Sequence, residues 1–261
     1  MLAGCKLSHR SRHHPLGQKL SAGPPPGGPC YFNRPVQTIA YIEALNLYLG
    51  ALKPVGCKWL NLEQWLDGQF PRNTITRIKY FTARVKPLEG DFGSCDRQSL
   101  YLKALSSLPR VEIIEGHYLV KQTTAMLAQM PASGSRYVSI IRSEEKQSDV
   151  NLASHHLLDA CRGNFEAAIV VSGDGDLSTP IRMATEEFQK PVVVLNPQRR
   201  SSYHLEQVAT AYRGTHFRRD REGMEIRVRN VGIRQGLLTA SQFPTSVSLP
   251  DGSVVVKPVG W

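Results

Sequence analysis

A short acidic segment, VVSGDGDLS at residues 170–178, places two carboxylates one glycine apart at the end of an apolar run. Two negative charges at such short range repel, and each raises the proton affinity of the other. Proteins relieve this repulsion with a bound cation, a shared proton or open water. Gly-Asp sequences also form ordinary turns, so Asp174 and Asp176 predict a site only if further acidic side chains reach the same place.

Two other acidic residues occupy comparable positions in the sequence. Glu43 ends the apolar run VQTIAYI (36–42), and Asp149 opens the amphipathic segment SDVNLASHHLLDAC (148–161). In a parallel sheet, the carboxyl ends of strands and the starts of the following helices share one edge. We therefore expect the four carboxylates at one rim, where they suit Mg²⁺ or Mn²⁺, ions that prefer oxygen ligands. Such ions lower the pKa of bound water and stabilise charge on a phosphate under attack.

The elements that must position these acids alternate along the chain. Buried strands are predicted at 36–42, 77–83, 111–119, 167–173 and 191–196. Helices are predicted at 46–65 with a break near 54–56, and at 95–108, 148–161, 177–189 and 203–212. In the helix at 148–161 the inward face is expected to carry Val150, Leu157, Leu158 and Cys161. Without tight hairpin signals between strands, this order predicts an α/β fold, a Rossmann-like parallel sheet with helices on both faces.

Composition and charge restrict the function classes. The chain has 261 residues, 41% of them hydrophobic, and a net charge of +10. An apolar run of the roughly 20 residues that a membrane helix needs is missing. The basic charge favours a polyanionic partner, with RNA or another nucleic acid as the first candidate, although a solvated basic surface fits equally well. Self-association is left open.

The N-terminal residues and the cysteines bear on location. Residues 1–34 contain five Lys or Arg, three His, no acidic residue and a Pro/Gly cluster, which predicts a disordered basic tail. An organellar transit peptide would also fit this composition. Five widely spaced cysteines form no CxxC pair, and no secretory leader is recognisable, which favours a reducing, cytoplasmic compartment. Cys161 is expected to pack in the core.

Several segments, taken in order, carry a family resemblance. YIEALNLYLGALK (41–53), KWLNLEQW (58–65), EEKQSDVNLA (144–153), VVSGDGDLSTPIR (170–182) and VVVLNP (192–197) resemble the NYN domain family, a branch of the PIN-like nuclease superfamily related to LabA-type proteins. The resemblance extends over 36–261, apart from an apparent insertion near 219–235. It implies a domain at 35–217 and a C-terminal extension at 218–261 that packs on it.

The resemblance also implies roles for individual residues. A metal-dependent ribonuclease is expected, in which Glu43, Asp149, Asp174 and Asp176 hold Mg²⁺ or Mn²⁺ and carry the catalysis. Asn46 and Ser172 are expected to orient the substrate, and phosphate contacts are assigned to Lys146, Arg199 and Arg200. The chain departs from the family pattern at Glu43, where aspartate is usual, at Ala44, and at Gln147, where glycine is common. A longer side chain at position 43 can misplace an ion, and a shift of ~1 Å can cost ~100-fold in rate.

Other readings of the same residues remain open. A non-catalytic RNA-binding or interaction module that keeps the fold is the main alternative, and the change at Glu43 favours it. DGDLS also fits the DxDx[ST] string of haloacid dehalogenase phosphatases, and a glutamate with a later DxD fits a Toprim-like site. The first lacks the expected downstream acidic pair, and the second does not explain Asn46 or the SDV block.

The C-terminal third is rich in arginine. MEIRVRNV (224–231) alternates apolar and polar residues, which predicts an edge strand or hairpin. Its arginines, with others nearby, either contact phosphates or discourage edge-to-edge aggregation. The arginines concerned are Arg218, Arg219, Arg221, Arg227, Arg229 and Arg234.

Overall fold

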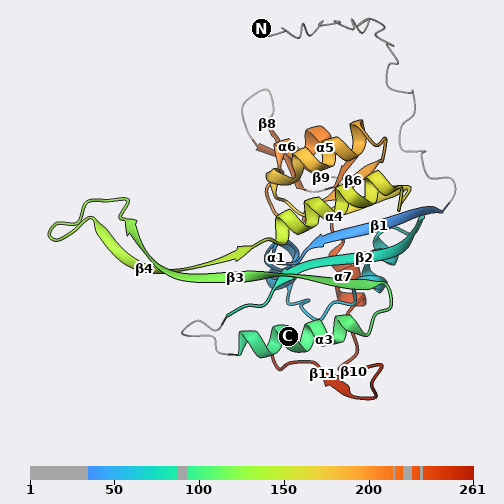
Figure 1. Ribbon diagram of the computed structural model, residues 1–261, viewed down its shortest axis with the longest axis horizontal. Helices are drawn as coiled ribbons and strands as arrows, with labels where there is room; N and C mark the ends of the chain where they lie inside the picture. The colour runs from blue at the N-terminus through green and yellow to red at the C-terminus, as the bar shows by residue number, and fades with distance from the viewer. Residues whose placement is uncertain (1–34, 87–92, 214, 220–224, 230–231) are drawn as a thin grey trace, which may run out of the picture. The chain divides into compact units, whose positions relative to one another are not determined.

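The computed structural model describes residues 35–86, 93–213, 215–219, 225–229 and 232–261 (Figure 1). The predicted tail at 1–34 lies outside these residues, as does Arg221. The side chains of Arg218, Arg219, Arg227 and Arg229 are likewise outside the description.

A mostly parallel, seven-stranded sheet forms the centre of the fold. Its strands lie in the order β4-β3-β2-β1-β5-β6-β7, and each neighbouring pair is parallel except β3 and β4. This confirms the predicted α/β class. The strands are β1 (Val36–Glu43), β2 (Asn73–Ala83), β3 (Val111–Met126), β4 (Tyr137–Lys146), β5 (Ala167–Val171), β6 (Val192–Leu195) and β7 (Ala211–Arg213).

The strand order creates a switch point beside β1. The chain adds β2 and β3 on one side of β1, and later adds β5, β6 and β7 on the other side. In open α/β sheets the helices before and after such a reversal lie on opposite faces, which leaves a crevice at the carboxyl ends of the two central strands. Here the two central strands are β1, whose last residue is Glu43, and β5, which ends shortly before Asp174.

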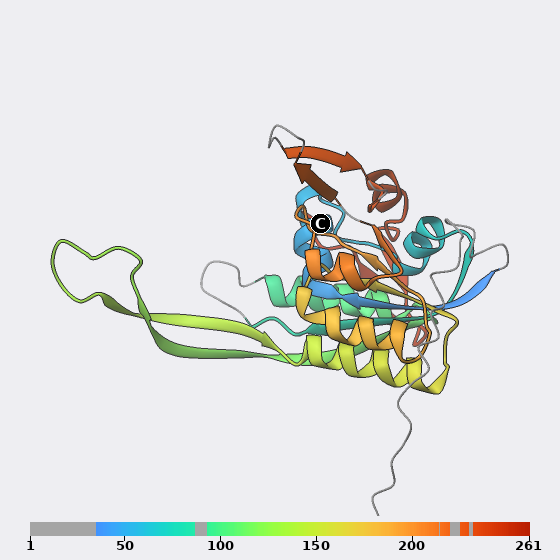
Figure 2. The ribbon, with the colours of Figure 1, turned by 90° about the horizontal axis from the view of Figure 1, so that it is seen from above.

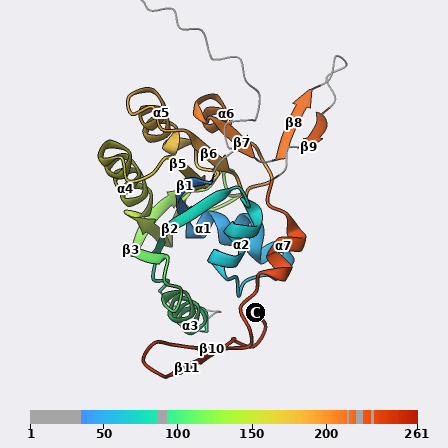
Figure 3. The same cartoon turned by 90° about the vertical axis from the view of Figure 1, so that its right-hand side faces the viewer.

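Helices cover both faces of the sheet, as predicted (Figure 3). Helices α4, α5 and α6 lie on one face, and α1, α2, α3 and α7 lie on the other. The helices are α1 (Ala44–Leu47), α2 (Leu62–Gln69), α3 (Ser94–Ser106), α4 (Ser148–Arg162), α5 (Ser178–Glu186), α6 (Tyr203–Val208) and α7 (Gln235–Ala240). A π turn at Tyr48–Leu52 and a 3₁₀ turn at Lys53–Val55 follow α1 and account for the break expected near Pro54.

Alternate residues of the central strands supply the two cores between the sheet and its helices. Ala40 and Ile42 of β1 face one core, and Ile39 and Tyr41 face the other. Strands β5 and β6 are buried along their whole length. Both faces of these strands are covered, which explains their continuous runs of Ala, Val, Ile and Leu.

Strand β3 differs from the prediction, because it continues to Met126 rather than ending at residue 119. Val111–Gly116 are parallel to β2, and His117–Met126 pair antiparallel with β4 in a ribbon that extends away from the helices (Figures 1 and 2). The connection at 127–136 is longer than the two-residue turns that mark a hairpin in a sequence. The ribbon was therefore missed, although its return places Lys146 directly before α4.

The inward face predicted for α4 is wrong. Val150, Leu158 and Cys161 are exposed, and the buried face is formed by Leu152, His156, Asp159 and Ala160. Asp159 accepts hydrogen bonds from Lys79 Nζ at 2.6 Å and from the Tyr41 hydroxyl at 2.7 Å. A buried ion pair with the sheet therefore turns the helix about its axis, against its apolar pattern.

Two further predictions about the C-terminal half have definite outcomes. The helix predicted at 203–212 ends at Val208, and residues 211–213 form β7 at the edge of the sheet. The hairpin predicted around 224–231 is confirmed at the level of the backbone, since β8 (Thr215–Arg219) pairs antiparallel with β9 (Glu225–Arg229). A small ribbon of β10 (Ser246–Ser248) and β11 (Val254–Val256) follows α7.

The C-terminal residues pack against the segment that precedes α2. Gln242 Oε1 accepts a hydrogen bond from the Trp59 amide at 3.0 Å, and the Trp59 indole donates to the Pro244 carbonyl at 2.9 Å. The Trp261 ring lies 6.4 Å from that of Trp59. The boundary expected between residues 217 and 218 stays a prediction. Within the described residues, every helix is too short or too polar to cross a membrane.

Candidate metal centre

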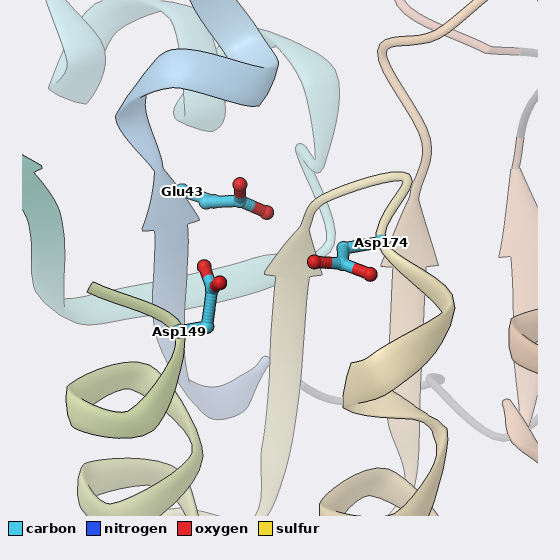
Figure 4. A group of neighbouring side chains, drawn as sticks. All are labelled: Glu43, Asp149 and Asp174. Carbon is cyan, nitrogen blue, oxygen red and sulfur yellow. The ribbon is translucent and has the colours of Figure 1, made fainter. Parts of the chain in front are cut away.

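Three of the four predicted acids lie together at the carboxyl edge of the sheet. Glu43 ends β1, Asp149 lies in the first turn of α4, and Asp174 follows β5 (Figure 4). One carboxylate oxygen from each lies within 4.8 Å of the others. Glu43 lies more than a hundred residues before the other two acids, and yet all three carboxylates point into one small space.

Close backbone approaches bring these segments together. At Gly116 of β3, a Cβ atom would lie 2.4 Å from the Lys146 carbonyl oxygen, so the chain entering α4 passes directly against β3. At Gly173, a Cβ atom would lie 2.6 Å from Asn196 Oδ1. Gln147, at the start of α4, has a φ of 76°, in the left-handed region that favours glycine. Glycine, which the resemblance implies at this position, would adopt the same conformation without strain.

Glu43 is a buried carboxylate held by two side chains. Ser172 Oγ donates a hydrogen bond to Glu43 Oε2 at 2.5 Å, and Asn46 Nδ2 donates to Glu43 Oε1 at 2.6 Å. Burial raises the pKa of Glu43 to about 7; the two hydrogen bonds lower it, and the charges of Asp149 and Asp174 raise it further. The carboxylate is therefore oriented but its negative charge is poorly compensated by its neighbours.

Asn46 connects the two central strands. Its Oδ1 accepts hydrogen bonds from the Gly173 amide at 3.1 Å and from Gln198 Nε2 at 2.8 Å. With its amide nitrogen on Glu43, the Asn46 side chain spans from the end of β1 to the loop after β5. Asn46 therefore contacts other residues of the site, and its expected role in orienting the substrate stays a prediction.

Ser172 and Asp176 are placed differently. Ser172 is fully buried, and its Oγ also accepts a hydrogen bond from the Asp174 amide at 2.9 Å. Asp176 is exposed and lies in the 3₁₀ turn at Gly175–Leu177, where its amide donates to Asp174 Oδ1 at 3.0 Å. Asp176 is not one of the three acids that meet within 4.8 Å, although its charge helps to raise the pKa of Asp149 after burial and Asp174.

The three residues predicted to contact phosphate, Arg199, Arg200 and Lys146, lie on two different segments. Arg199 and Arg200 are exposed and line an open hollow of about 520 Å³, shared with Gly173 and Ser202. This hollow adjoins the loop that carries Asp174. Lys146 is exposed at the end of β4, and its Nζ lies 2.9 Å from Glu144 Oε2.

The residues present fit a hard divalent cation. The donor set is entirely carboxylate oxygen, which suits Mg²⁺ or Mn²⁺ better than metals that favour Cys and His. Across the described ranges, no Lys or Arg forms an ion pair with Glu43, Asp149 or Asp174. Partial burial also raises the pKa of Asp149, and the charges of Asp174 and Asp176 raise it further. The cluster thus lacks the positive charge that would balance it.

Gln198 and Asn196 support this site without a role predicted from the sequence, whereas Glu145 was considered as an assisting residue but expected to be exposed. Gln198 holds Asn46, and Asn196 accepts the Gln198 amide at 2.8 Å while donating to the Tyr212 hydroxyl at 2.6 Å. Glu145 accepts a short hydrogen bond from Ser148 Oγ, and its pKa is raised by burial and by the charge of Asp149. The available signal for Asn196 was its place at the carboxyl end of a buried strand, as for Glu43.

The raised pKa of Glu43 predicts a pH-dependent stability. Glu43→Gln is expected to stabilise the metal-free protein increasingly as the pH rises from about 4.5 to about 7, by no more than about 3 kcal/mol. Over that range the native glutamate keeps a proton that the unfolded state loses, so the unmodified protein loses stability while the glutamine variant does not. Urea unfolding in EDTA at several pH values measures this difference.

The difference between the two proteins is the quantity to measure, because His156 acts in the opposite direction. Burial lowers the pKa of His156 to about 4, so its contribution is present above about pH 6.5 and is lost as the pH falls through about 4. Both proteins contain His156, and its contribution cancels in the difference. A difference that stays constant between pH 5 and 8 would contradict the burial of charge at Glu43.

Comparison with known proteins places the chain in a family. A model of the NYN domain matches residues 60–213. The 6-hydroxy-3-succinoylpyridine 3-monooxygenase HspA of Pseudomonas putida (strain DSM 28022 / S16) is 28% identical over 255 residues, covering 88% of this chain and 76% of that protein. A solved protein of unknown function from Vibrio parahaemolyticus RIMD 2210633 has a TM-score of 0.42 at 14% identity, covering 69% of this chain and 93% of its own. The NYN match spans more than half of the chain, which therefore belongs to the NYN domain family, within the PIN-like nuclease superfamily.

Proposed function

We propose that this protein is a metal-dependent ribonuclease that hydrolyses phosphodiester bonds at the cluster of Glu43, Asp149 and Asp174. The observation that carries the proposal is the meeting of three carboxylates from three elements within 4.8 Å, at the switch point of an NYN domain. NYN nucleases typically use divalent metals, and this donor set suits Mg²⁺ or Mn²⁺. A bound divalent ion would supply positive charge to stabilise the phosphate under attack and to activate water.

The side chains divide the work of holding that ion and the RNA. Glu43, Asp149 and Asp174 provide oxygen ligands, while Ser172 and Asn46 hold Glu43 in a single orientation through hydrogen bonds of 2.5 and 2.6 Å. Asp176, exposed beside Asp174, is proposed as an outer ligand that acts through water or on binding of the RNA. Positioning of this kind supplies a large share of the rate acceleration of a phosphodiesterase, because the protein forms no covalent bond with the substrate and acts by orienting and stabilising the reacting groups.

Basic side chains beside the cluster are proposed to hold the RNA backbone. Arg199 and Arg200 line the open hollow next to Gly173, and Lys146 ends β4 next to α4. Contacts of this kind neutralise phosphates and add affinity without reading sequence. The net charge of +10 is consistent with a polyanionic partner.

The replacement of aspartate by Glu43 defines the alternative, a module that binds RNA without cutting it. The buried, doubly hydrogen-bonded position of Glu43 argues for a functional carboxylate, since an unused buried acid lowers stability. Glu43→Asp would shorten the side chain by one carbon and test which length places the ligand correctly.

The test is an RNA cleavage assay with purified protein. We expect single-stranded RNA to be cut in the presence of Mn²⁺ or Mg²⁺, and cleavage to stop when EDTA is added. Asp174→Asn should lose both cleavage and Mn²⁺ binding measured by calorimetry. Asp176→Asn should lose less of each, because Asp176 is proposed as an outer ligand and Asp174 as an inner one. RNA binding without any cleavage would favour the non-catalytic module, and cleavage that persists in Asp174→Asn would indicate a contaminating nuclease.

A second candidate function comes from the relative whose name describes a monooxygenase of a substituted pyridine. That protein is 28% identical over most of both chains, so an activity on small hydroxylated pyridines is the alternative to test. Oxygen uptake with 6-hydroxy-3-succinoylpyridine and reduced nicotinamide as electron donor would show it. Activity in that assay, with none on RNA, would replace the ribonuclease proposal.

A further inference from the structure

A cavity of about 150 Å³ lies next to the carboxylate cluster, on the side of the sheet covered by α1 and α3. Ala44, which follows Glu43, lines one wall, and Glu145 lines another. The charge of Asp149 is close enough to Glu145 to raise its pKa, after the larger effect of burial. The cavity and the cluster therefore share the same edge of the sheet and two adjoining stretches of chain.

Aromatic and aliphatic side chains form most of the walls. The rings of Tyr80 and Tyr101 lie edge to face at 6.4 Å, and the Trp261 ring lies 5.8 Å from Tyr101. Leu45, Leu52 and Val85 add aliphatic surface, and the charged side chains of Lys58 and Arg97 also reach the wall. A cavity of about 150 Å³ lined by apolar side chains is large enough to bind benzene. One six-membered ring is thus the size of ligand that fits, and edge-to-face contacts favour an aromatic one.

Two of the polar groups at the cavity wall, the Tyr80 hydroxyl and the Glu145 carboxylate, bear most directly on the choice of ligand. Tyr80 is 5% exposed, and its hydroxyl forms no hydrogen bond with any residue of the described ranges. The Tyr80 hydroxyl can therefore donate a hydrogen bond to an acceptor on a ligand in the cavity. The Tyr101 hydroxyl, in contrast, already donates to the Leu60 carbonyl at 2.9 Å.

Glu145 is the second group. It accepts a hydrogen bond from Ser148 Oγ and one from the Tyr118 hydroxyl at 3.4 Å, and a carboxylate can accept further bonds. Burial raises the pKa of Tyr80, and the charge of Glu145 raises it further, which places the two groups within electrostatic reach. Tyr80 and Glu145 thus offer a donor and an acceptor at a wall that also carries Lys58 and Gln98.

We propose that this cavity binds a single six-membered heteroaromatic lactam ring, which has a carbonyl oxygen next to a ring N–H. The carbonyl would accept from the Tyr80 hydroxyl, and the ring N–H would donate to Glu145. Uracil in an RNA chain and a free pyridone both present this edge, and each would be held beside Glu43 and Asp149. The inference does not depend on phosphodiester hydrolysis. If the protein does hydrolyse RNA, the cavity would select a uridine next to the cleaved bond.

Binding is tested without metal, so that its outcome is independent of cleavage. Calorimetric or NMR titrations in EDTA use uridine, 2-pyridone, and short oligouridine and oligoadenosine strands. We expect uridine and 2-pyridone to bind, Tyr80→Phe to weaken both at least fivefold through the lost hydrogen bond, and Leu45→Trp to abolish binding by filling the mouth. Tyr203→Phe and Val55→Trp, at exposed positions away from the cavity, serve as matched controls.

The strands identify the source of the ring. Tighter binding of oligouridine than of uridine, with weak binding of oligoadenosine, indicates a base in RNA; binding of 2-pyridone with exclusion of both strands indicates a free small molecule. Melting temperatures of the variants show whether they are folded. If Tyr80→Phe does not fold, Leu45→Trp still tests the proposal, because Leu45 is partly exposed and its replacement does not disturb the core. The proposal is overturned if neither ring binds at millimolar concentration, or if binding is equal in Leu45→Trp and the unmodified protein.

Discussion

Replacing Asp149 with asparagine is expected to reduce Mn²⁺-dependent RNA cleavage about 100-fold or more, and yet to make the metal-free protein more stable. Loss of a ligand removes several kcal/mol of charge stabilisation from the reaction, and each 1.36 kcal/mol is tenfold in rate. Without an ion the same carboxylate is unfavourable, because partial desolvation and the charges of Asp174 and Asp176 raise its pKa, although the residue itself is exposed to solvent. Asparagine keeps the shape and removes the charge.

Two measurements check this prediction together. Single-turnover cleavage rates and calorimetric Mn²⁺ affinity should both fall, while the melting temperature in EDTA should rise. Glu187→Gln, which removes one charge from an exposed position, is the matched control and should change none of the three quantities. Unchanged Mn²⁺ affinity in Asp149→Asn would exclude this residue from the site, and a lower melting temperature in EDTA would contradict the repulsion.

Replacing Lys79 with methionine is expected to destabilise the protein by about 3–5 kcal/mol, because it leaves the buried Asp159 without its cation. The Lys79 and Asp159 side chains are both 6% exposed, with Nζ 2.6 Å from Oδ2. Burial works against the charge on Asp159, but hydrogen bonds from Lys79, Asn164 and Tyr41 lower its pKa overall. The aspartate therefore stays ionised in the folded protein and depends on these donors.

Denaturant unfolding measures the loss of stability, and Arg77, which lies on the same strand β2 as Lys79, provides the control. Arg77 lies 3.8 Å from Glu112, with both side chains about half exposed, so Arg77→Met should cost no more than about 1 kcal/mol. The double variant Lys79→Met with Asp159→Leu should recover most of the loss, because it removes both buried charges. A loss of less than about 1 kcal/mol in Lys79→Met would show that the pair does not hold α4 on the sheet.

This ion pair matters for the site because α4 carries Asp149 in its first turn. The contact of Asp159 with Lys79 and Tyr41 sets the rotation of α4 against β1 and β2. Cleavage by Lys79→Met, measured at a temperature where the variant is folded, should therefore fall together with Mn²⁺ affinity. Arg77→Met should retain both.

The sequence alone determined the class of fold and the edge at which the acids gather. Strands rich in Val and Ile alternate with amphipathic helices, and this order requires a parallel sheet whose strand ends share one rim. Each acid of the cluster directly follows a strand or opens a helix, so its position along the chain already placed it at that rim. Local sequence patterns were sufficient to predict these strands and helices, because each element forms through interactions between residues close together in the chain.

Only the tertiary structure decided which acids meet and which helix faces are buried. Asp176 was indistinguishable from Asp174 in the sequence, but its amide donates to the Asp174 side chain in a 3₁₀ turn, which leaves its own carboxylate exposed and outside the group of three. The face of α4 depended on Lys79, 80 residues from Asp159 along the chain, and no local pattern reveals such a pairing. Glu145 lies close enough to Asp149 for that charge to raise its pKa, because β4 returns along β3. Contacts between distant segments are set by complementary charge and hydrogen bonding in three dimensions, so hydrophobic periodicity does not predict them.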